Sequence, residues 1–318
     1  MAIYVLKRIG LAMMLVWLVA TLIFMILHAV PGDPAELLLS QGGVAPDPAQ
    51  VEELREQLGL NLPLLTQYWN YLSGVLQGDL GSSLQDGHAV AEEIWLRLPR
   101  TLELIGAAAL LSLLIGLPTG ILAARRVNTL LDRVLSVTAS VFLSIPVFVV
   151  GTLSVLIFSQ QLRIVPAGGY TPPSKDLMGH LVLLAMPAGT IAVGLAAVVF
   201  RTTRNAMLEI LGRDFVRAAH AKGVKEKRIV VHHVLRNALI PIVTVFALQI
   251  GTLLGGTVLV EYVFNWPGLS GYLVRSVEAR DYPEVVGIVL VISILFVLLN
   301  LAVDLLYAAL DPRVRYAR

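Results

Sequence analysis

Residues 104–126 read LIGAAALLSLLIGLPTGILAARR. The apolar part, 104–124, is long enough to cross about 30 Å of hydrocarbon, which takes roughly 20 helical residues. Arg125 and Arg126 follow it at once, and positive charges beside an apolar run are typical of a cytoplasmic membrane boundary. This stretch predicts a transmembrane helix, and with it a membrane protein.

Five further apolar runs have the same character, at 9–30, 134–158, 181–200, 239–260 and 285–306. Asp304 is the only charged residue in the six runs, as expected where a central charge costs about 2.5 to 3.5 kcal/mol. Only 14% of the chain is charged, against about 25% in soluble proteins. We predict an all-α polytopic membrane protein with six transmembrane helices, the inner ones interrupted by prolines at 118, 146, 187 and 241.

The loops predict the orientation of these helices. Segments 1–8, 125–133, 201–238 and 307–318 carry 17 Lys and Arg residues against 5 acidic ones, whereas the opposite loops carry 7 basic and 16 acidic residues. Positively charged loops stay inside, so both termini are expected in the cytoplasm. The first run resembles a secretory signal, but its 22 residues exceed the usual core of about 7 to 15, which favours an uncleaved anchor.

The same topology divides the chain into four parts: 1–30, the cytoplasmic end and first helix; 31–103, an external segment; 104–310, a core domain with five transmembrane helices and the cytoplasmic loop 201–238; and 311–318, a cytoplasmic tail. In the external segment, Asp47-Pro48 predicts the start of a helix and Gly59 its end. This segment is either a folded cap over the helices or a docking surface for an external partner. Docking would suit exposed side chains at Tyr68, Trp69 and Tyr71.

The sequence contains no pattern that predicts catalysis. There is no cysteine, and the phosphate-binding loop that ends in Gly-Lys-Ser/Thr is absent, so the chain is not expected to hydrolyse ATP itself. Adjacent residues of a helix diverge by about 100°, which argues against a metal site at His232-His233. Asp304 alone provides no proton relay. We predict no enzyme activity, cofactor, metal or nucleic-acid partner.

Small and polar residues within the apolar runs suggest how the helices are used. The pairs Gly116/Gly120 and Gly251/Gly255 predict close helix packing. Four polar residues are candidates to line a translocation path, although single polar residues also simply bond between helices: Ser140, Ser144, Gln249 and Thr252.

The segment 201–238 is the most informative. Asp214 is expected to cap a short helix, which Gly223 ends with a positive φ angle, and a second helix is expected to start near Lys225. Small side chains at 218, 219, 221 and 223 would let the backbone of another protein approach closely. The segment therefore predicts a docking helix in which four residues share one face: Phe215, Ala218, Ala219 and Lys222.

The stretch RAAHAKG at 217–223 resembles the Glu-Ala-Ala-x-x-x-Gly signature of ABC importer permeases, with Arg217 in place of the glutamate. Further stretches are similar to the dipeptide, oligopeptide and nickel branch, and PGDP with the long external segment resembles the first of its two paired permeases. These stretches are PGDP at 31–34, GDLGSS at 78–83, LRNALIP at 235–241, EYVFNWPGL at 261–269 and DPR at 311–313.

This resemblance implies a type I ABC importer permease fold in a bacterial inner membrane, and alternating access driven by partners. Those partners are a second homologous permease, two cytoplasmic ABC ATPases that bind ATP and Mg, and an external substrate-binding protein. Peptides are the expected substrate, with nickel, glutathione or another small solute as alternatives. A secondary carrier and a membrane-anchored structural or regulatory protein also stay open. The resemblance implies an ATPase-coupling set of Asp214, Phe215, Arg217, Ala218, Ala219, Lys222 and Gly223.

Overall fold

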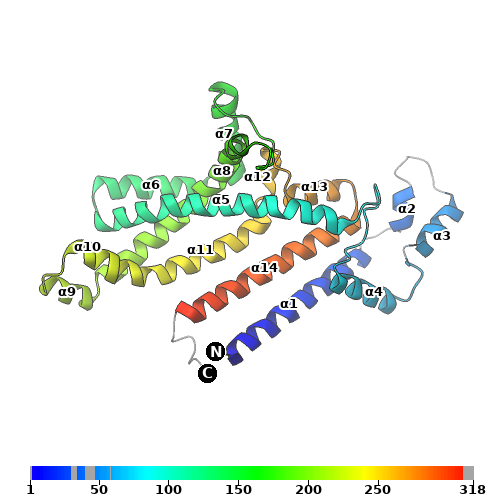
Figure 1. Cartoon of the computed structure of the whole chain (residues 1–318), viewed down its shortest axis with the longest axis horizontal. Helices are drawn as coiled ribbons and strands as arrows, with labels where there is room; N and C mark the ends of the chain where they lie inside the picture. The colour runs from blue at the N-terminus through cyan, green and yellow to red at the C-terminus, as the bar shows by residue number, and fades with distance from the viewer. Residues whose placement is uncertain (1, 30–33, 40–46, 58, 311–318) are drawn as a thin grey trace. The chain divides into compact units, whose positions relative to one another are not determined.

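The computed structural model is helical and describes residues 2–29, 34–39, 47–57 and 59–310 (Figure 1). Within these residues, one antiparallel bridge joins Ser82 and Ala89. Two helices, η2 and η3, have π-helical hydrogen bonding. In chain order the helices are α1 (Ala2–Ala29), α2 (Pro34–Leu39), α3 (Pro48–Gln57), α4 (Leu64–Gln77), α5 (Val90–Arg125), α6 (Leu130–Ser144), α7 (Val147–Ser154), η2 (Val155–Gln161), α8 (Leu177–Leu211), α9 (Asp214–Ala221), α10 (Glu226–Arg228), η3 (Ile229–Leu235), α11 (Arg236–Gly256), α12 (Val258–Val263), α13 (Leu269–Glu278) and α14 (Tyr282–Leu310).

Among the described residues, five helices are long and apolar enough to cross a membrane, and one bent pair makes a sixth span possible. The sequence prediction of six apolar spans corresponds to these six elements, although the third is not one straight helix. The spans are Val5–Ile26, Val90–Arg125, Leu177–Leu211, Glu226–Leu253, Tyr282–Ala302, and the pair Leu130–Ser144 with Val147–Gln161.

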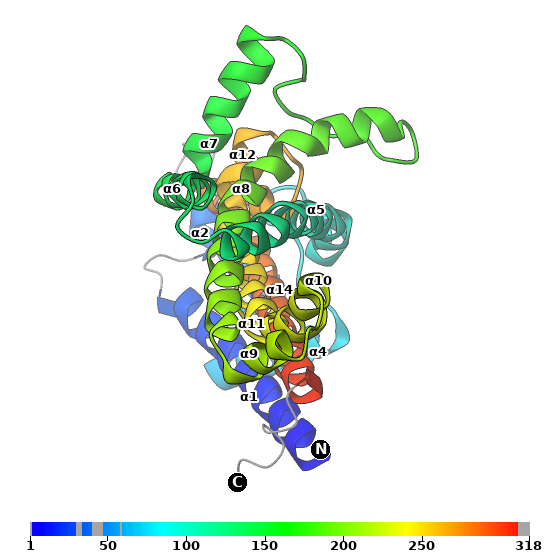
Figure 2. The same ribbon diagram turned by 90° about the vertical axis from the view of Figure 1, so that its left-hand side faces the viewer.

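The bent pair turns by 100° at Pro146, and Figure 2 shows α6 end-on with α7 rising away from it. Pro146 occupies the N-cap of α7, and Ile145 before it is extended, with φ −90° and ψ 126°. This is the conformation that a following proline favours. The expectation that Pro118, Pro187 and Pro241 also interrupt their helices is wrong, because α5, α8 and α11 continue through them.

The chain forms two compact units. The first comprises 1–9, 97–271 and 298–318, and α8 is the most buried of the five single-helix spans in the described residues. Gly116 and Gly120 of α5 lie directly against α8: a Cβ atom on Gly116 would be 2.6 Å from the Ala196 carbonyl oxygen. Close packing at this pair is thus confirmed, whereas a Cβ atom on Gly255 would meet nothing within 4 Å.

An ion pair joins α6 to α8 in the same unit. Arg204 donates from Nε to Asp132 Oδ1 at 2.6 Å and from Nη2 to Oδ2 at 2.9 Å. The Asp132 side chain is buried, and its second oxygen also accepts from the backbone N–H of Asn128. Two parallel bonds between a guanidinium and a carboxylate fix geometry as well as adding energy, so this contact sets how α6 lies on α8.

The second unit comprises 10–96 and 272–297. Its core joins α1, α14 and α4 through a cluster built on Ala20, Ile23, Val286 and Leu290. The predicted helix after Asp47 is present as α3: Asp47 Oδ1 accepts from the Ala49 N–H at 3.0 Å, and Gly59 follows the helix with φ +68°.

The expectation of three exposed aromatic residues on this segment is only partly met. Tyr68 and Tyr71 are half-buried, and their rings lie against Phe24 of α1. Trp69 alone is exposed, at 61%. On a helix, residues one apart point in different directions, so neighbouring aromatics could not all face outward.

Candidate coupling site

The helix α9 is a short amphipathic element at one end of the first unit, close to α10 in both views (Figures 1 and 2). Val216 is buried and anchors α9 in a cluster with Met207 of α8 and with Ile229 and Val230. Ala219 also packs against this cluster. The cluster holds α9 on the ends of longer helices, so its outward surface has a fixed backbone.

The outward surface of α9 is exposed and mostly small. Phe215 is 46% exposed, and Ala218 and Lys222 are exposed as well. These three residues share a face as the sequence predicted, but Ala219 is half-buried and turns toward the cluster. The accessible surface is therefore an aromatic ring beside alanines, with basic side chains around it.

The start of α9 differs from the prediction. Arg213 occupies the N-cap position, with no capping hydrogen bond from its side chain, and Asp214 is the first helical residue. Asp214 Oδ1 instead lies 2.9 Å from Arg217 Nη2, and both side chains are highly exposed. An acidic residue in the first turn still interacts favourably with the helix dipole. The basic residue that replaces the family's glutamate thus pairs within its own helix.

The end of α9 follows the prediction. Gly223 has φ +72°, its N–H donates to the His220 carbonyl at 2.9 Å, and the Val224 N–H donates to the Ala219 carbonyl at 3.2 Å. These two bonds define a Schellman motif, in which the residue after the cap takes a left-handed conformation. A second helix, α10, begins at Glu226, as expected near Lys225.

A histidine closes the turn that contains Gly223. His220 Nε2 lies 2.8 Å from Glu226 Oε2, and His220 Nδ1 lies 3.0 Å from the Val216 carbonyl. The hydrogen bond to Glu226 raises the pKa of His220, and the bond to the Val216 carbonyl adds to that rise. The charged imidazolium is thus favoured, and it links α9 to α10.

The candidate path residues form two pairs on different helices. Ser140 and Ser144 of α6 line an open groove of about 450 Å³ together with Ser136, Val137, Val141 and Ile145. Their hydroxyls donate to the carbonyls of Ser136 and Ser140 in the preceding turn, each at 2.9 Å. On α11, Thr252 Oγ1 donates to the Gln249 carbonyl at 2.8 Å.

The structure also shows a buried carboxylate that sequence reasoning did not single out. Glu261 accepts at Oε1 from the Thr101 hydroxyl at 2.7 Å and at Oε2 from the Gly271 N–H at 2.8 Å. Thr101 Oγ1 in turn accepts from the Leu269 N–H at 2.8 Å. Burial raises the pKa of Glu261, although the Gly271 and Thr101 donors favour its charged form. This carboxylate orders the segment that carries the EYVFNWPGL stretch.

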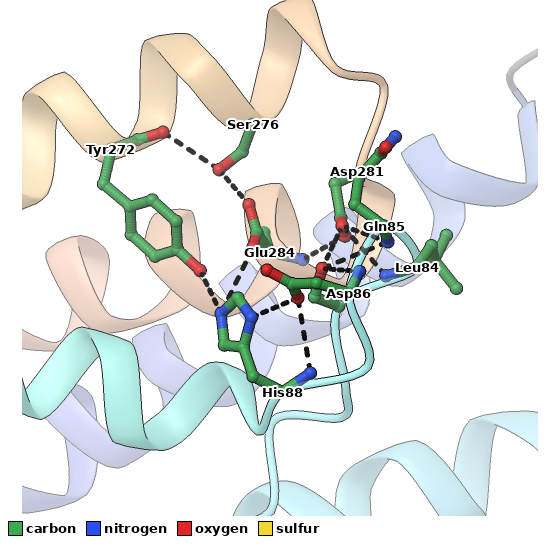
Figure 3. Close-up of polar contacts among 9 residues, drawn as sticks. Leu84, Gln85, Asp86, His88, Tyr272, Ser276, Asp281 and Glu284 are labelled. Carbon is green, nitrogen blue, oxygen red and sulfur yellow. Dashed lines mark hydrogen bonds and ion pairs between the residues drawn. The ribbon is translucent and has the colours of Figure 1, made fainter. Parts of the chain in front are cut away.

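A second network, in the other unit, is drawn in Figure 3. Asp281 Oδ2 accepts from the Ser83 hydroxyl at 2.7 Å and from the Leu84 N–H at 2.9 Å. His88 bonds Asp86 through Nδ1, and its Nε2 lies 3.5 Å from Glu284. Asp281 lies 198 positions from Ser83 and 197 from Leu84, so no spacing could have revealed these contacts. The network holds the GDLGSS loop against the start of α14.

Comparison with known proteins shows the family to which this chain belongs. Residues 116–316 match the family described as "Binding-protein-dependent transport system inner membrane component", and residues 1–105 match the N-terminal component of the same kind of system. This chain belongs to that family of permeases. The resemblance found in the sequence motifs is thereby confirmed, and the protein is a multi-pass inner-membrane permease of an ABC importer. ATP is bound by the partner ATPases of such importers and not by the permease.

Named relatives cover nearly the whole permease. This permease is 42% identical to the glutathione transport system permease protein GsiC of Escherichia coli strain K12, and the match covers 98% of this chain and 99% of GsiC. It is 43% identical to the GsiC of Salmonella choleraesuis over the same shares of the two chains. Among solved structures, an inward-facing MetNI methionine ABC transporter matches with TM-score 0.56 and 23% identity, over 69% of this permease and 96% of that chain. An amino acid ABC transporter solved with histidines matches with TM-score 0.53 and 17% identity, over 69% and 94%. At these identities the solved structures support the fold alone.

Proposed function

We propose that this permease forms half of a transmembrane path for short peptides delivered by an external binding protein, with a second, homologous permease forming the other half. Two cytoplasmic ATPases dock on the two permeases. In this chain the docking element is α9 and the turn after it, with Asp214, Phe215, Arg217, Ala218, Ala219, Lys222 and Gly223 as the coupling set. This places the 201–238 segment and both termini in the cytoplasm.

The observation that carries the proposal is the way α9 is built. Its inner face is fixed by the buried Val216, and its outer face presents Phe215 and Ala218. Small side chains allow close backbone approach, and an exposed aromatic residue is typical of the centre of an interface. A helix anchored on a hydrophobic cluster transmits displacement to α8 and α11, because closely packed interiors transmit strain.

ATP can drive transport through this contact only under one condition. The groove of the ATPase must fit α9 differently in its open and closed states, since a contact of equal strength in both would shift no equilibrium. Closure of the ATPases then moves α9 and the helices packed on it. The groove lined by Ser140 and Ser144 lies on α6, which Arg204 ties to α8, so it belongs to a helix that this movement reaches.

Glutathione is the second candidate substrate, and the relatives favour it. The E. coli and Salmonella permeases that cover this chain at 42–43% identity are named for glutathione transport. Glutathione is itself a small peptide, so the two proposals differ in how wide a range of peptides is accepted. Nickel and other small solutes are the remaining alternatives within the family.

The test is reconstitution of the complete importer in proteoliposomes with its binding protein. Uptake of labelled dipeptides, an oligopeptide, glutathione and Ni²⁺ is measured with and without ATP, alongside direct binding of each solute to the binding protein. ATP-dependent uptake of several peptides supports the first proposal, and uptake of glutathione alone supports the second. Uptake by this permease without ATPases would instead indicate a secondary carrier.

Docking of α9 is tested separately by cross-linking. The chain contains no cysteine, so a single cysteine at the exposed Ala218 can be linked specifically to a cysteine in the ATPase groove. The exposed Ala49 of α3 is the matched control, because alanine is replaced in both variants. Cross-linking at position 49 but not at 218 would reject the proposed site and orientation.

A further inference from the structure

The helix α4 has three different faces and no charged residue. Its sequence is LLTQYWNYLSGVLQ, which is unusual for a helix in a segment where 11 acidic residues occur between positions 31 and 103. At about 100° per residue, Tyr68, Tyr71 and Val75 fall on one face. Two further faces, one apolar and one polar, are exposed in the part of the chain that the structure describes.

The first face packs against α1 within the second unit. The Tyr68 hydroxyl lies 2.7 Å from Thr21 Oγ1, and the Tyr68 and Tyr71 rings contact Phe24. Val75 joins the core cluster that contains Ala20 and Ile23. Figure 1 draws α4 beside the C-terminal end of α1.

These contacts place α4 beside the C-terminal part of the apolar span in α1. That span runs to Ile26, and Thr21, whose hydroxyl meets Tyr68, is five positions before its end, about 7.5 Å along a helix. Interfacial helices are buried about 5 to 10 Å into the boundary between headgroups and acyl chains, so a helix at that boundary is within reach of this contact.

The second face is apolar and exposed. Leu65, Trp69 and Leu76 are 68%, 61% and 88% exposed, and they fall within about 40° of one another around the helix. The third face consists of polar residues, which fall within a further sector of about 60° and are exposed: Thr66, Asn70, Ser73 and Gln77. One side thus suits hydrocarbon and the adjacent side suits water.

The apolar face continues a surface that is already lipid-facing by composition. The span in α1 is only 6% buried within this chain, and Leu22, Met25 and Ile26 of its outer end are exposed. The surface beside this apolar face is polar but uncharged, because α4 contains no charged residue. Tryptophan and tyrosine are the residues enriched where a membrane meets water.

We propose that α4 lies in the membrane–water interface at the C-terminal end of α1, with Leu65, Trp69 and Leu76 in contact with lipid. Its polar face points to the aqueous side, and Tyr68 and Tyr71 hold it on α1. The helix thereby ties the segment between α1 and α5 to the membrane surface. This inference does not depend on the substrate or on the role of α9.

Spin labels measure this contact directly in the assembled importer in lipid nanodiscs. The chain has no native cysteine, so Leu65→Cys and Leu76→Cys each carry one label. Frequent collisions of the label with oxygen indicate that it lies in lipid. Frequent collisions with a water-soluble nickel complex indicate that it lies in water. The controls are Met14→Cys, on the exposed face of the α1 span, and Gln50→Cys, on an exposed position of α3. Each variant is first shown to assemble and to hydrolyse ATP.

At positions 65 and 76 the ratio of oxygen to nickel collisions is expected to be several-fold higher than at 50. It should be lower than at 14, because an interfacial helix lies near the membrane surface. Ratios equal to that at 50 would place this face in water and overturn the proposal. Exclusion of both reagents would also overturn it, since the face would then be covered by another protein, such as the second permease or the binding protein.

Discussion

His220 Nε2 lies 2.8 Å from the Glu226 carboxylate, across the turn in which Gly223 has φ +72°. The five residues between them therefore form a closed unit that joins α9 to α10. This unit borders the surface proposed to meet the ATPase. Its geometry depends on one glycine and on one titratable pair, and each gives a prediction.

Gly223→Val is expected to uncouple ATP hydrolysis from uptake without unfolding the spans. A left-handed backbone costs a residue with a side chain about 1 to 2 kcal/mol, and a β-branched residue tolerates it worst. No atom within 4 Å would meet the new Cβ atom, so the effect is on the turn and not on packing. The ratio of solute transported to ATP hydrolysed measures it.

Gly223→Asn is the matched control, because asparagine enters the left-handed region more readily than other residues. It should retain most of the coupling. Equal loss in both variants would show that the missing side chain, and not the backbone conformation, is what the site requires. Unchanged uptake in Gly223→Val would argue against a coupling role for this turn.

The His220–Glu226 contact is expected to make the turn more stable at low pH. Glu226 raises the pKa of His220 in the folded protein, so the stabilisation is complete below the pKa of the unfolded chain. It is lost as the pH rises through the folded pKa. Hydrogen exchange of residues 214–226, corrected for intrinsic rates and followed across this range, should show protection falling with pH.

In Glu226→Gln the carboxylate is replaced by a neutral amide, and this pH dependence should largely disappear. If protection still falls in the same way in that variant, another group controls the turn. Both side chains are exposed, so high salt is also expected to weaken the effect.

Gly116→Ala is expected to destabilise the permease by about 1 to 3 kcal/mol, the usual cost of overpacking. The new Cβ atom would lie 2.6 Å from the Ala196 carbonyl oxygen and 2.8 Å from the Val199 Cβ atom. Thermal unfolding in detergent measures the change. Gly106→Ala on the same helix is the control, because a Cβ atom there meets nothing within 4 Å. Similar losses at both positions would show that helix contact is not the cause.

Thr101→Val is expected to cost about 1 to 3 kcal/mol, because it removes hydrogen-bond partners from buried groups. Glu261 Oε1 would lose its nearer donor, at 2.7 Å, and keep the Thr257 hydroxyl at 3.5 Å, while the Leu269 N–H would lose its acceptor at 2.8 Å. Thr101→Ser keeps the hydroxyl and should restore most of the stability. A serine variant as unstable as the valine variant would instead indicate that the methyl group of Thr101 is what matters.

Sequence patterns located the membrane spans, α3 and the boundaries of the α9–α10 turn, because each depends on local features. A charge-free run of about 20 residues and a glycine after a short helix are readable without knowing what lies nearby. The same reasoning misjudged the prolines. Pro146 breaks its span and Pro118 does not, and a membrane helix tolerates an internal proline where neighbouring groups re-satisfy the freed carbonyl.

The capping of α9 and the exposure of its side chains were also predicted wrongly from neighbouring residues alone. Asp214 was expected to cap α9, but it pairs with Arg217 from the first turn. Ala219 was placed on the outward face, but it packs against the cluster beneath. The side chain of Asp304 and the DPR stretch lie outside the described residues.

The sequence by itself determined that this protein is a helical membrane protein, because hydrophobic length and loop charge are properties of neighbouring residues, and the resemblance of its short motifs to ABC importer permeases indicated the family. Only the tertiary structure decided which distant groups meet: Thr101 with Glu261, Ser83 with Asp281, and Tyr68 with Thr21. Hydrogen bonds act over about 3 Å, so partners far apart along the chain can be identified only after folding has brought them together.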